Sequence, residues 1–123
     1  MTKKTTKKGD AEVARATLKH IRLSPRKARL VIDLIRGKQV EPAMQVLRYS
    51  PKKGAKLAYK LLESAVSNAR EGARADVDRL WVTKGWVDAG RTLKRYMPAA
   101  HGRATPIRKR SSHMTIEIGR AHV

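Results

Sequence analysis

The sequence predicts an α+β fold in which three helices pack on a small antiparallel sheet, with a long β-hairpin protruding from this body. Proline-marked helix starts and apolar residues at helical spacing fill the first half of the chain. The second half changes to β-forming residues. Between two predicted strands lies a basic stretch with few large apolar side chains, which predicts a protruding hairpin.

The chain has 123 residues, which is the size of one small domain. We expect residues 12–119 to form that domain. Residues 1–11 carry four lysines with Thr and Gly, which predicts a disordered basic tail, and residues 120–123 form a short second tail. No apolar segment follows the basic start and no apolar run reaches 18 residues, so we expect neither a secretory signal nor a membrane span.

A short strand is expected at residues 13–23, followed by a helix. Ser24 is the predicted N-cap and Pro25 the first helical residue. Gly37 stands where a left-handed C-cap belongs. The apolar side chains between these signals recur at helical spacing: Ala28, Val31, Ile32 and Ile35.

Two further helices are expected. A short one starts at Glu41–Pro42 and runs to about Arg48. Ser50 and Pro51 repeat the start signal of the first helix, and Gly72 closes the third. This third helix carries one wide apolar stripe made of Leu57, Ala58, Leu61, Leu62, Ala65, Val66 and Ala69.

Two strands are expected after the helices. Residues 80–87 are rich in β-formers, and residues 114–118 alternate apolar with polar side chains. Trp81 and Trp86 are five apart, so a regular strand would turn them to opposite faces. One would then be exposed, which indicates either a bulge near Gly85 or a partner that covers it.

The hairpin is expected at about residues 86–114. Gly102 is the natural turn, with Pro98 and Pro106 four residues to either side. Each arm would reach roughly 33 Å at ~3.3 Å per residue. Such a ribbon is marginally stable alone in water and needs a partner. The alternative is a solvated, disordered basic loop.

The charge balance points to a polyanionic partner. The chain has 29 Lys and Arg against 10 Asp and Glu, a formal net charge of +19. Nucleic acid is the first candidate, because neutralising phosphates releases condensed counterions. Acidic membranes are the second, although the basic residues do not share one long amphipathic helix. With no Phe, two Trp and three Tyr, platforms that stack several bases are poorly supported.

Two acid-free runs supply the candidate contacts, residues 13–32 and residues 89–116. Cations at a helix start oppose the helix dipole, and an external anion would resolve that conflict. His101 could stack on a base at the hairpin tip, and His113 is expected to form hydrogen bonds at a strand end. The candidate RNA-binding residues are Arg15, Lys19, Arg22, Arg26, Lys27, Arg29, Arg91, Lys94, Arg95, His101, Arg103, Arg108, Lys109, Arg110 and His113.

An enzyme is not indicated. There is no Cys, no metal-ligand spacing among the four histidines, no Gly-rich phosphate loop and no paired acid and base. We therefore expect no catalytic residue, no metal, no cofactor and no small-molecule substrate. A DNA-compacting architectural protein is the rival reading. Such proteins usually carry an apolar wedge at the arm tip, whereas the tip here is Ala-His-Gly-Arg.

Four segments carry a resemblance to a known family. Residues 24–38 (SPRKARLVIDLIRGK) resemble the first-helix signature of the large ribosomal subunit protein twenty-two family, and residues 62–69 (LESAVSNA) its long helix. Residues 87–98 (VDAGRTLKRYMP) and 102–116 (GRATPIRKRSSHMTI) resemble its hairpin arm and C-terminal signature. The likeness is collinear from about residue 15 to 119.

The resemblance implies a structural rRNA-binding protein of the cytoplasmic ribosome that supports assembly of the large subunit. Its body would lie outside, near the exit of the polypeptide tunnel, and its hairpin would line the tunnel wall. The implied partners are large-subunit rRNA, neighbouring ribosomal proteins and the nascent polypeptide near the hairpin. The residues that match the tunnel-lining part of the family's hairpin are Leu93, Lys94, Arg95, Gly102 and Arg103.

The chain departs from the family's pattern at three places. The family commonly has Gly-Pro where this chain has Gly90–Arg91, which affects the expected bend of the ribbon. Residues 70–74 replace an Asn/His-rich link, and Thr105–Pro106 replaces a pair containing Asp.

Overall fold

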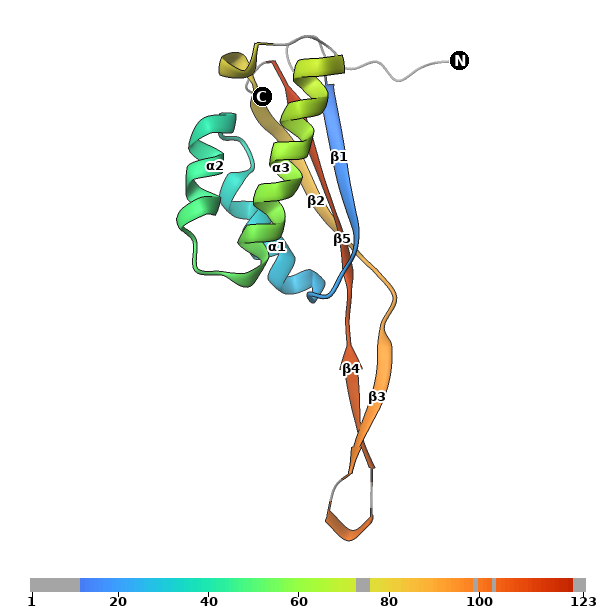
Figure 1. Cartoon of the computed structure of the whole chain (residues 1–123). Coiled ribbons are helices and arrows are strands. Elements are labelled where there is room, and N and C mark those ends of the chain that lie inside the picture. Colours follow the sequence, from blue (N-terminus) through green and yellow to red (C-terminus); the bar gives the residue numbers. More distant parts are fainter. Residues whose placement is uncertain (1–11, 73–75, 99, 103, 121–123) are drawn as a thin grey trace, which may run out of the picture.

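The computed structural model describes residues 12–72, 76–98, 100–102 and 104–120 (Figure 1). The tail at 1–11 lies outside these residues, as does all of the second expected tail except Arg120. The body is a three-stranded antiparallel sheet, and a separate two-stranded ribbon extends away from it. The sheet has the order β1 (Glu12–Ile21), β5 (Ser112–Gly119), β2 (Trp81–Ala89), and the ribbon pairs β3 (Leu93–Pro98) with β4 (Ala104–Lys109).

Three helices cover one face of the sheet, as Figure 1 shows. They are α1 (Pro25–Ile35), α2 (Val40–Tyr49) and α3 (Lys53–Gly72). The predicted α+β fold with three helices and a protruding hairpin is confirmed. The first strand begins at Glu12, one residue before the expected start, and ends at Ile21, two residues before the expected end.

The start and end of α1 follow the predicted signals. The Ser24 hydroxyl accepts a hydrogen bond from the backbone amide of Lys27 at 3.4 Å, and Pro25 is the first helical residue. Arg36 is the C-cap, and Gly37 beyond it has a φ of +84°. This left-handed conformation favours glycine and turns the chain toward α2.

The predicted start of α3 at Ser50–Pro51 is wrong. Ser50 is the C-cap of α2, and its hydroxyl accepts from the backbone amide of Lys52 at 3.3 Å, so it is not free to cap α3. The residue before a proline is disfavoured in the helical region. Ser50 and Pro51 therefore form the turn between the two helices, and α3 begins at Lys53.

The core lies between the sheet and the helices. α3 packs on β1 and β5, while α1 packs on β2. α1 lies so close to β2 at Gly85 that a Cβ atom there would be 2.9 Å from Cγ2 of Ile32. The largest fully buried apolar side chains come from every layer: Val31, Ile32, Ile35, Val40, Leu47, Leu62, Leu80, Val82, Met114, Ile116 and Ile118.

A bulge in β2 decides the position of the two tryptophans. The pairing with β5 shifts between Val82 and Lys84. Trp81 pairs with Gly119 and Trp86 with Thr115, four residues apart on β5, so both rings lie on the sheet face opposite the helices. Both are half-buried. Of the two alternatives, a bulge near Gly85 or a covering partner, the bulge is present, slightly earlier in the strand, and neither tryptophan lies in the core.

The hairpin continues two neighbouring strands of the body, the central strand β5 and the edge strand β2. β2 leads into β3 and β4 leads into β5, so residues 86–89 and 112–114, which were expected in the hairpin, pair within the body sheet. Leu93 pairs with Lys109 at the base and Pro98 with Ala104 near the tip. The tip is a 3-10 turn, η3 (Ala100–Gly102), in which His101 and Gly102 have φ of +62° and +71°.

Candidate RNA interface

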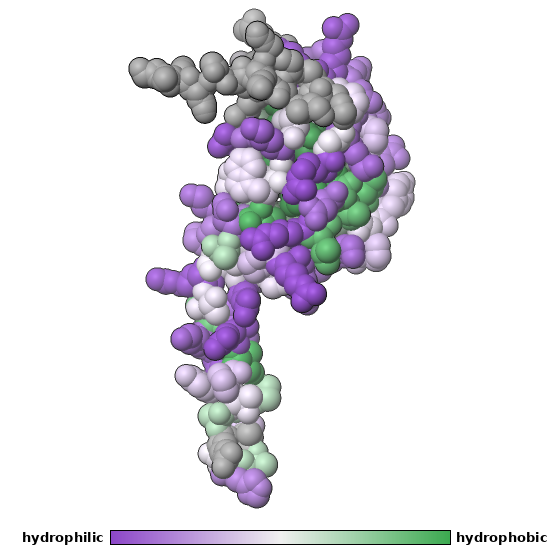
Figure 2. Space-filling view, turned by 180° about the vertical axis from the view of Figure 1, so that it is seen from behind, coloured by the Kyte–Doolittle hydropathy of each residue, from purple (hydrophilic) through white to green (hydrophobic). Residues whose placement is uncertain are grey.

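The outer face of the sheet presents several of the predicted cations. Arg15 and Lys19 are exposed on β1, and Lys84 is exposed on β2. His113 on β5 lies on the same face, because it pairs with Asp88 while the core residue Met114 points to the helices. Figure 2, seen from behind, shows hydrophilic side chains gathered over this side of the body and the upper hairpin. The sheet therefore gives the interface a firm, polar platform.

Arg15 is held in place by two neighbours. Its Nη2 lies 2.6 Å from a carboxylate oxygen of Glu117, which is directly opposite in the ladder. Its guanidinium carbon lies 5.7 Å from the centroid of the Trp86 ring, within range of a cation–π contact. The Arg15 side chain remains 49% exposed, while that of Glu117 is 8% exposed. Arg15 therefore shields a buried carboxylate and still faces solvent.

The two histidines on this face contact each other where the sheet ends. The backbone amide of His20 donates to Nδ1 of His113 at 3.0 Å, and the rings are T-shaped with centroids 5.1 Å apart. His20 has a φ of +61°, an unusual conformation for a residue other than glycine. The expectation that His113 forms hydrogen bonds at a strand end is confirmed. His20 is the partner, which the sequence did not indicate.

The base of the hairpin, which we call the neck (residues 90–92 and 110–112), is fixed by serines. The Ser111 hydroxyl donates to the Arg91 carbonyl at 2.6 Å, and the Gly90 amide donates to the Ser111 carbonyl at 2.9 Å. The fully buried Ser112 hydroxyl donates to the Leu23 carbonyl at 2.9 Å. This last bond ties the turn before α1 to the neck.

Two sets of cations that are remote in sequence therefore meet at one end of the body. The turn between β1 and α1 lies at the end from which the hairpin extends (Figure 1). Arg22 in this turn and Arg26 and Lys27 in the first turn of α1 are all exposed. Arg91 and Arg110, at the neck, are exposed as well. These five cations outnumber the one acid at the end of β2, Asp88, which is exposed and pairs with His113, so this end of the body is basic.

Arg29 differs from its neighbours because it has a role within the fold. Its Nη2 donates to the backbone carbonyl of Val87 at 3.1 Å and links α1 to β2. Arg36, one turn beyond Ile32, does the same with the carbonyl of Gly85. A cation at such a position stabilises the body whether or not a phosphate lies nearby.

The ribbon has two different faces, because side chains alternate along each strand and paired residues share a face. On one face Lys94 lies opposite Arg108, next to Tyr96 and Pro106. Like charges directly opposite each other destabilise a strand pair. The other face, which mixes cations with apolar side chains, consists of Leu93, Arg95, Met97, Thr105, Ile107 and Lys109.

The ribbon residues are open to solvent. Lys94, Arg95, Arg108 and Lys109 are exposed, and so is His101 at the tip. Tyr96 and Met97 are 67% and 53% exposed, which is unusual for large apolar side chains. Arg103 lies outside the described residues, while Gly102 is described and exposed. The structure thus places the predicted cations that it describes on the ribbon, at the neck, on the outer sheet face, and on the β1–α1 turn with the start of α1.

Sequence reasoning missed Lys84 and the position of Trp86. Trp86 lies beside Arg15 on the outer face only because of the bulge, which alternation along a regular strand does not reveal. Lys84 falls outside both acid-free runs, and its face also depends on the bulge. The strand-breaking signal available in the sequence was Gly85.

Other kinds of site find no support in the described part of the chain. Among those residues, no group of three or more His, Cys, Asp or Glu is placed to hold a metal ion. None of the helices there is long and apolar enough to cross a membrane.

Comparison with known proteins decides the family. The family described as ribosomal protein L22p/L17e matches residues 16–119, most of the chain. The chain belongs to this family. A large ribosomal subunit protein uL22 from Syntrophotalea carbinolica is 54% identical over 105 residues, which cover 85% of this chain and 96% of the relative.

Two more relatives of the L22p/L17e family carry the same name. The uL22 protein of Geobacter metallireducens is 54% identical over 85% of this chain and 96% of its own length. The uL22 protein of Thermus thermophilus is 50% identical over 89% of this chain and 96% of its own length. The matches span the helices, the neck and the hairpin alike, so the L22p/L17e likeness includes the candidate interface.

Proposed function

We propose that this L22p/L17e family member is a structural protein of the large subunit of the cytoplasmic ribosome. It binds large-subunit rRNA, contacts neighbouring ribosomal proteins and supports assembly. Its hairpin lines the polypeptide exit tunnel and lies near the nascent chain, with Leu93, Lys94, Arg95, Gly102 and Arg103 in the inner part. Membership of the family and the uL22 relatives support the ribosomal assignment.

The observation that carries the RNA-binding role is the pairing of Lys94 with Arg108. Two cations face each other on a ribbon that has no apolar core and whose two strands pack mainly against each other. Their repulsion disfavours the ribbon in the free protein. A phosphate placed between them would turn that repulsion into two favourable contacts, so the ribbon is suited to an RNA-bound state.

Anchoring is mainly electrostatic under this proposal. The candidate contacts are the cations of the ribbon, of the neck, of the outer sheet face and of the segment from Arg22 to Arg29, together with His101 and His113. Phosphate contacts should outnumber base contacts, because A-form RNA is recognised mainly through its shape and backbone. The mixed faces of the ribbon fit a position between RNA and a passing peptide, since Met97 and Tyr96 offer apolar contacts beside cations.

Replacement of residues 94–109 by an Asn-Gly turn tests the proposal. The body core is untouched, so the shortened chain should unfold cooperatively. It loses Lys94, Arg95, Arg103, Arg108 and Lys109. If each contacts a phosphate, the slope of log K against log salt for a large-subunit rRNA fragment should shrink by about 4, at ~0.7–0.9 per contact.

The control is a variant with Lys52, Lys53, Lys56, Lys60 and Arg70 changed to Gln. These are five exposed cations on α3 and the turn before it, on the helical side of the body. We expect a smaller change of slope, although the charge removed is the same. A folded hairpin-less chain whose salt slope equals that of the wild type would refute the RNA contacts of the ribbon. Equal affinity for duplex DNA and for the rRNA fragment would favour the DNA-architectural alternative.

A further inference from the structure

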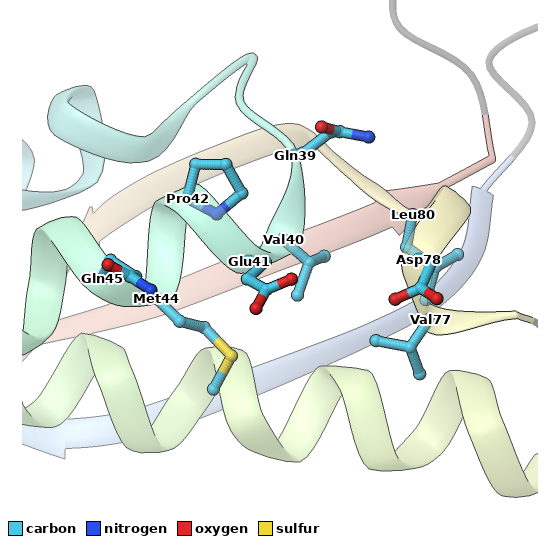
Figure 3. Close-up of a pocket in the computed structure, with 9 residues that line it drawn as sticks. All are labelled: Gln39, Val40, Glu41, Pro42, Met44, Gln45, Val77, Asp78 and Leu80. Carbon is cyan, nitrogen blue, oxygen red and sulfur yellow. The ribbon is translucent and has the colours of Figure 1, made fainter.

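A groove lies between the first turn of α2 and the 3-10 turn η2 (Val77–Arg79), at the end of the body away from the hairpin (Figures 1 and 3). Its volume is about 790 Å³. None of the residues that line it is among the candidate RNA contacts. The lining residues are Gln39, Val40, Glu41, Pro42, Met44, Gln45, Val77, Asp78 and Leu80.

The floor of the groove is apolar and well fixed. Val40 and Leu80 are 2% and 1% exposed, and the Val40 amide donates to the Leu80 carbonyl at 3.1 Å. Met44 and Val77 flank this floor and are only partly buried. The accessible apolar surface of the groove therefore comes mainly from Pro42, Met44 and Val77, which stand around this closed floor.

The rim of the groove is acidic on a strongly basic chain. The carboxylates of Glu41 and Asp78 both point into the space between α2 and η2 (Figure 3). Neither is in an ion pair within the described part of the chain, and no Lys, Arg or His lines the groove. In a chain with 29 cations and 10 acids, these two carboxylates make the rim locally acidic, and Arg48 stands only at the far end of the adjoining depression.

The groove continues along α2. A smaller depression of about 180 Å³ shares Glu41, Met44 and Gln45 with it and extends to Arg48 and Tyr59 on α3. The two depressions together follow the exposed side of α2 over more than two helical turns. That length suits an extended peptide better than a compact small molecule.

RNA is a poor occupant of this surface. Phosphates would approach two carboxylates, and each unscreened like-charge contact is unfavourable. The cations proposed to bind RNA lie instead on the sheet face, on the ribbon and at the neck, which is at the other end of the body (Figure 1). Inside a particle built of RNA and basic proteins, the complement of an acidic, apolar groove is a basic protein segment.

We propose that this groove docks an extended Lys/Arg-rich segment of a neighbouring protein in the same particle. One apolar side chain of that segment sits between Met44 and Val77, above the floor of the groove, and flanking cations reach Glu41 and Asp78. This proposal rests on the proposed function, because only that function identifies the particle as the large ribosomal subunit. It assigns the contact with a neighbouring protein to one surface, away from the hairpin.

A site-specific cross-link tests the docking in assembled particles. The chain has no Cys, so Gln45→Cys provides one attachment point for a photoactivatable maleimide, and Arg95→Cys on the ribbon provides a matched control. In purified large subunits we expect the probe at position 45 to link to a protein segment rich in Lys and Arg, and the probe at position 95 to link to RNA. The proposal is overturned if the groove probe links to RNA, to the chain's own residues 1–11, or to nothing while the ribbon probe reacts.

Removal of the charges separates this groove from the RNA interface. Glu41→Gln with Asp78→Asn should lower the yield of the cross-link from position 45 at least fivefold. Glu63→Gln, an exposed acid on α3 outside the groove, should leave it unchanged. Affinity for the rRNA fragment should stay the same or rise slightly in the double variant. A fall in RNA affinity would overturn the separation of this groove from the RNA interface.

A synthetic peptide provides a test that does not depend on the ribosome. The probe is Lys-Arg-Leu-Lys-Arg, with Glu-Asp-Leu-Glu-Asp as its control, at 0.15 M salt, where distant cations of the chain are screened within ~8 Å. We expect the basic peptide to bind the isolated chain and the double variant to bind at least fivefold more weakly. Equal binding to both chains overturns the groove as the site. The chain could fail to enter large subunits and still bind the basic peptide more tightly than the double variant does. That result would refute the role in the ribosome and support the groove as a site for basic peptides.

Discussion

Arg36 donates two hydrogen bonds to the backbone carbonyl of Gly85, from Nε at 3.1 Å and from Nη2 at 2.8 Å. Its Nη1 also donates to Asp33 at 2.7 Å. The planar guanidinium thus joins the end of α1 to the middle of β2, where the two elements approach most closely. The high net charge therefore includes cations that hold the fold together, and these must be separated from those that bind RNA.

Arg36→Lys tests this structural role. The charge is kept, but an ammonium cannot reproduce the forked contact with one carbonyl. We expect the free energy of unfolding to fall by about 1–2 kcal/mol, since the partly buried Gly85 carbonyl loses its partner. Chemical denaturation measures the change. The salt slope of RNA binding should not move, and a change in that slope without a loss of stability would place Arg36 in the interface instead.

The basic residues at the start of α1 should have two different roles, RNA binding and stabilisation of the fold. Arg26→Gln with Lys27→Gln removes exposed charges that oppose the helix dipole, so we expect equal or slightly higher stability and weaker RNA binding. Arg29→Gln should instead cost about 1 kcal/mol of stability, because it breaks the hydrogen bond to the Val87 carbonyl. Thermal unfolding and filter binding of the two variants check this. A stable Arg29→Gln chain would show that this bond contributes little.

Arg15 and Glu117 should be coupled. Arg15→Gln leaves a carboxylate that is 8% exposed without its partner, and we expect a loss of about 1–2 kcal/mol, moderated because Arg15 is half exposed. Glu117→Gln should cost less and free the guanidinium, so RNA binding should tighten. The double variant completes a thermodynamic cycle for the pair. Strictly additive effects would show that the two residues act independently.

The ribbon should be the first part of the free chain to be cut. Its backbone is paired only within itself, and its side chains are almost all exposed. Brief digestion with trypsin should cleave between Arg91 and Arg110 while α1 and α3 survive. Added rRNA fragment should protect these bonds. Uniform resistance along the chain would indicate a ribbon that is rigid without RNA.

Local signals predicted the helices and their packing face well. Ser24, Pro25 and Gly37 act through their own backbone chemistry, so their roles could be read from the sequence. The Ser-Pro signal failed at Ser50 because this serine is the C-cap of α2 and not the N-cap of α3. Only the geometry of the preceding helix decides between the two.

The interface was less predictable than the fold. Acid-free runs located the cations, but they could not show that Arg29 is held by Val87 or that Arg15 covers Glu117. Those contacts join residues far apart in the chain. The groove between α2 and η2 left no signal in the sequence, since Glu41 and Asp78 come together through backbone hydrogen bonds between segments far apart in the chain, such as that from Val40 to Leu80.

The alternation of faces along β3 and β4 limits how such a ribbon can change length during evolution. Each strand turns successive side chains to opposite sides, so one residue inserted into both arms would rotate everything beyond it to the other side. With the insertion beyond Lys94 and Arg108, these two residues would keep their place relative to the neck, while His101 and the tip would point to the opposite side of the ribbon. Only insertions or deletions of two residues in each arm preserve both ends at once. The ribbon can therefore lengthen or shorten in steps of roughly 6.6 Å, twice the rise of ~3.3 Å per residue.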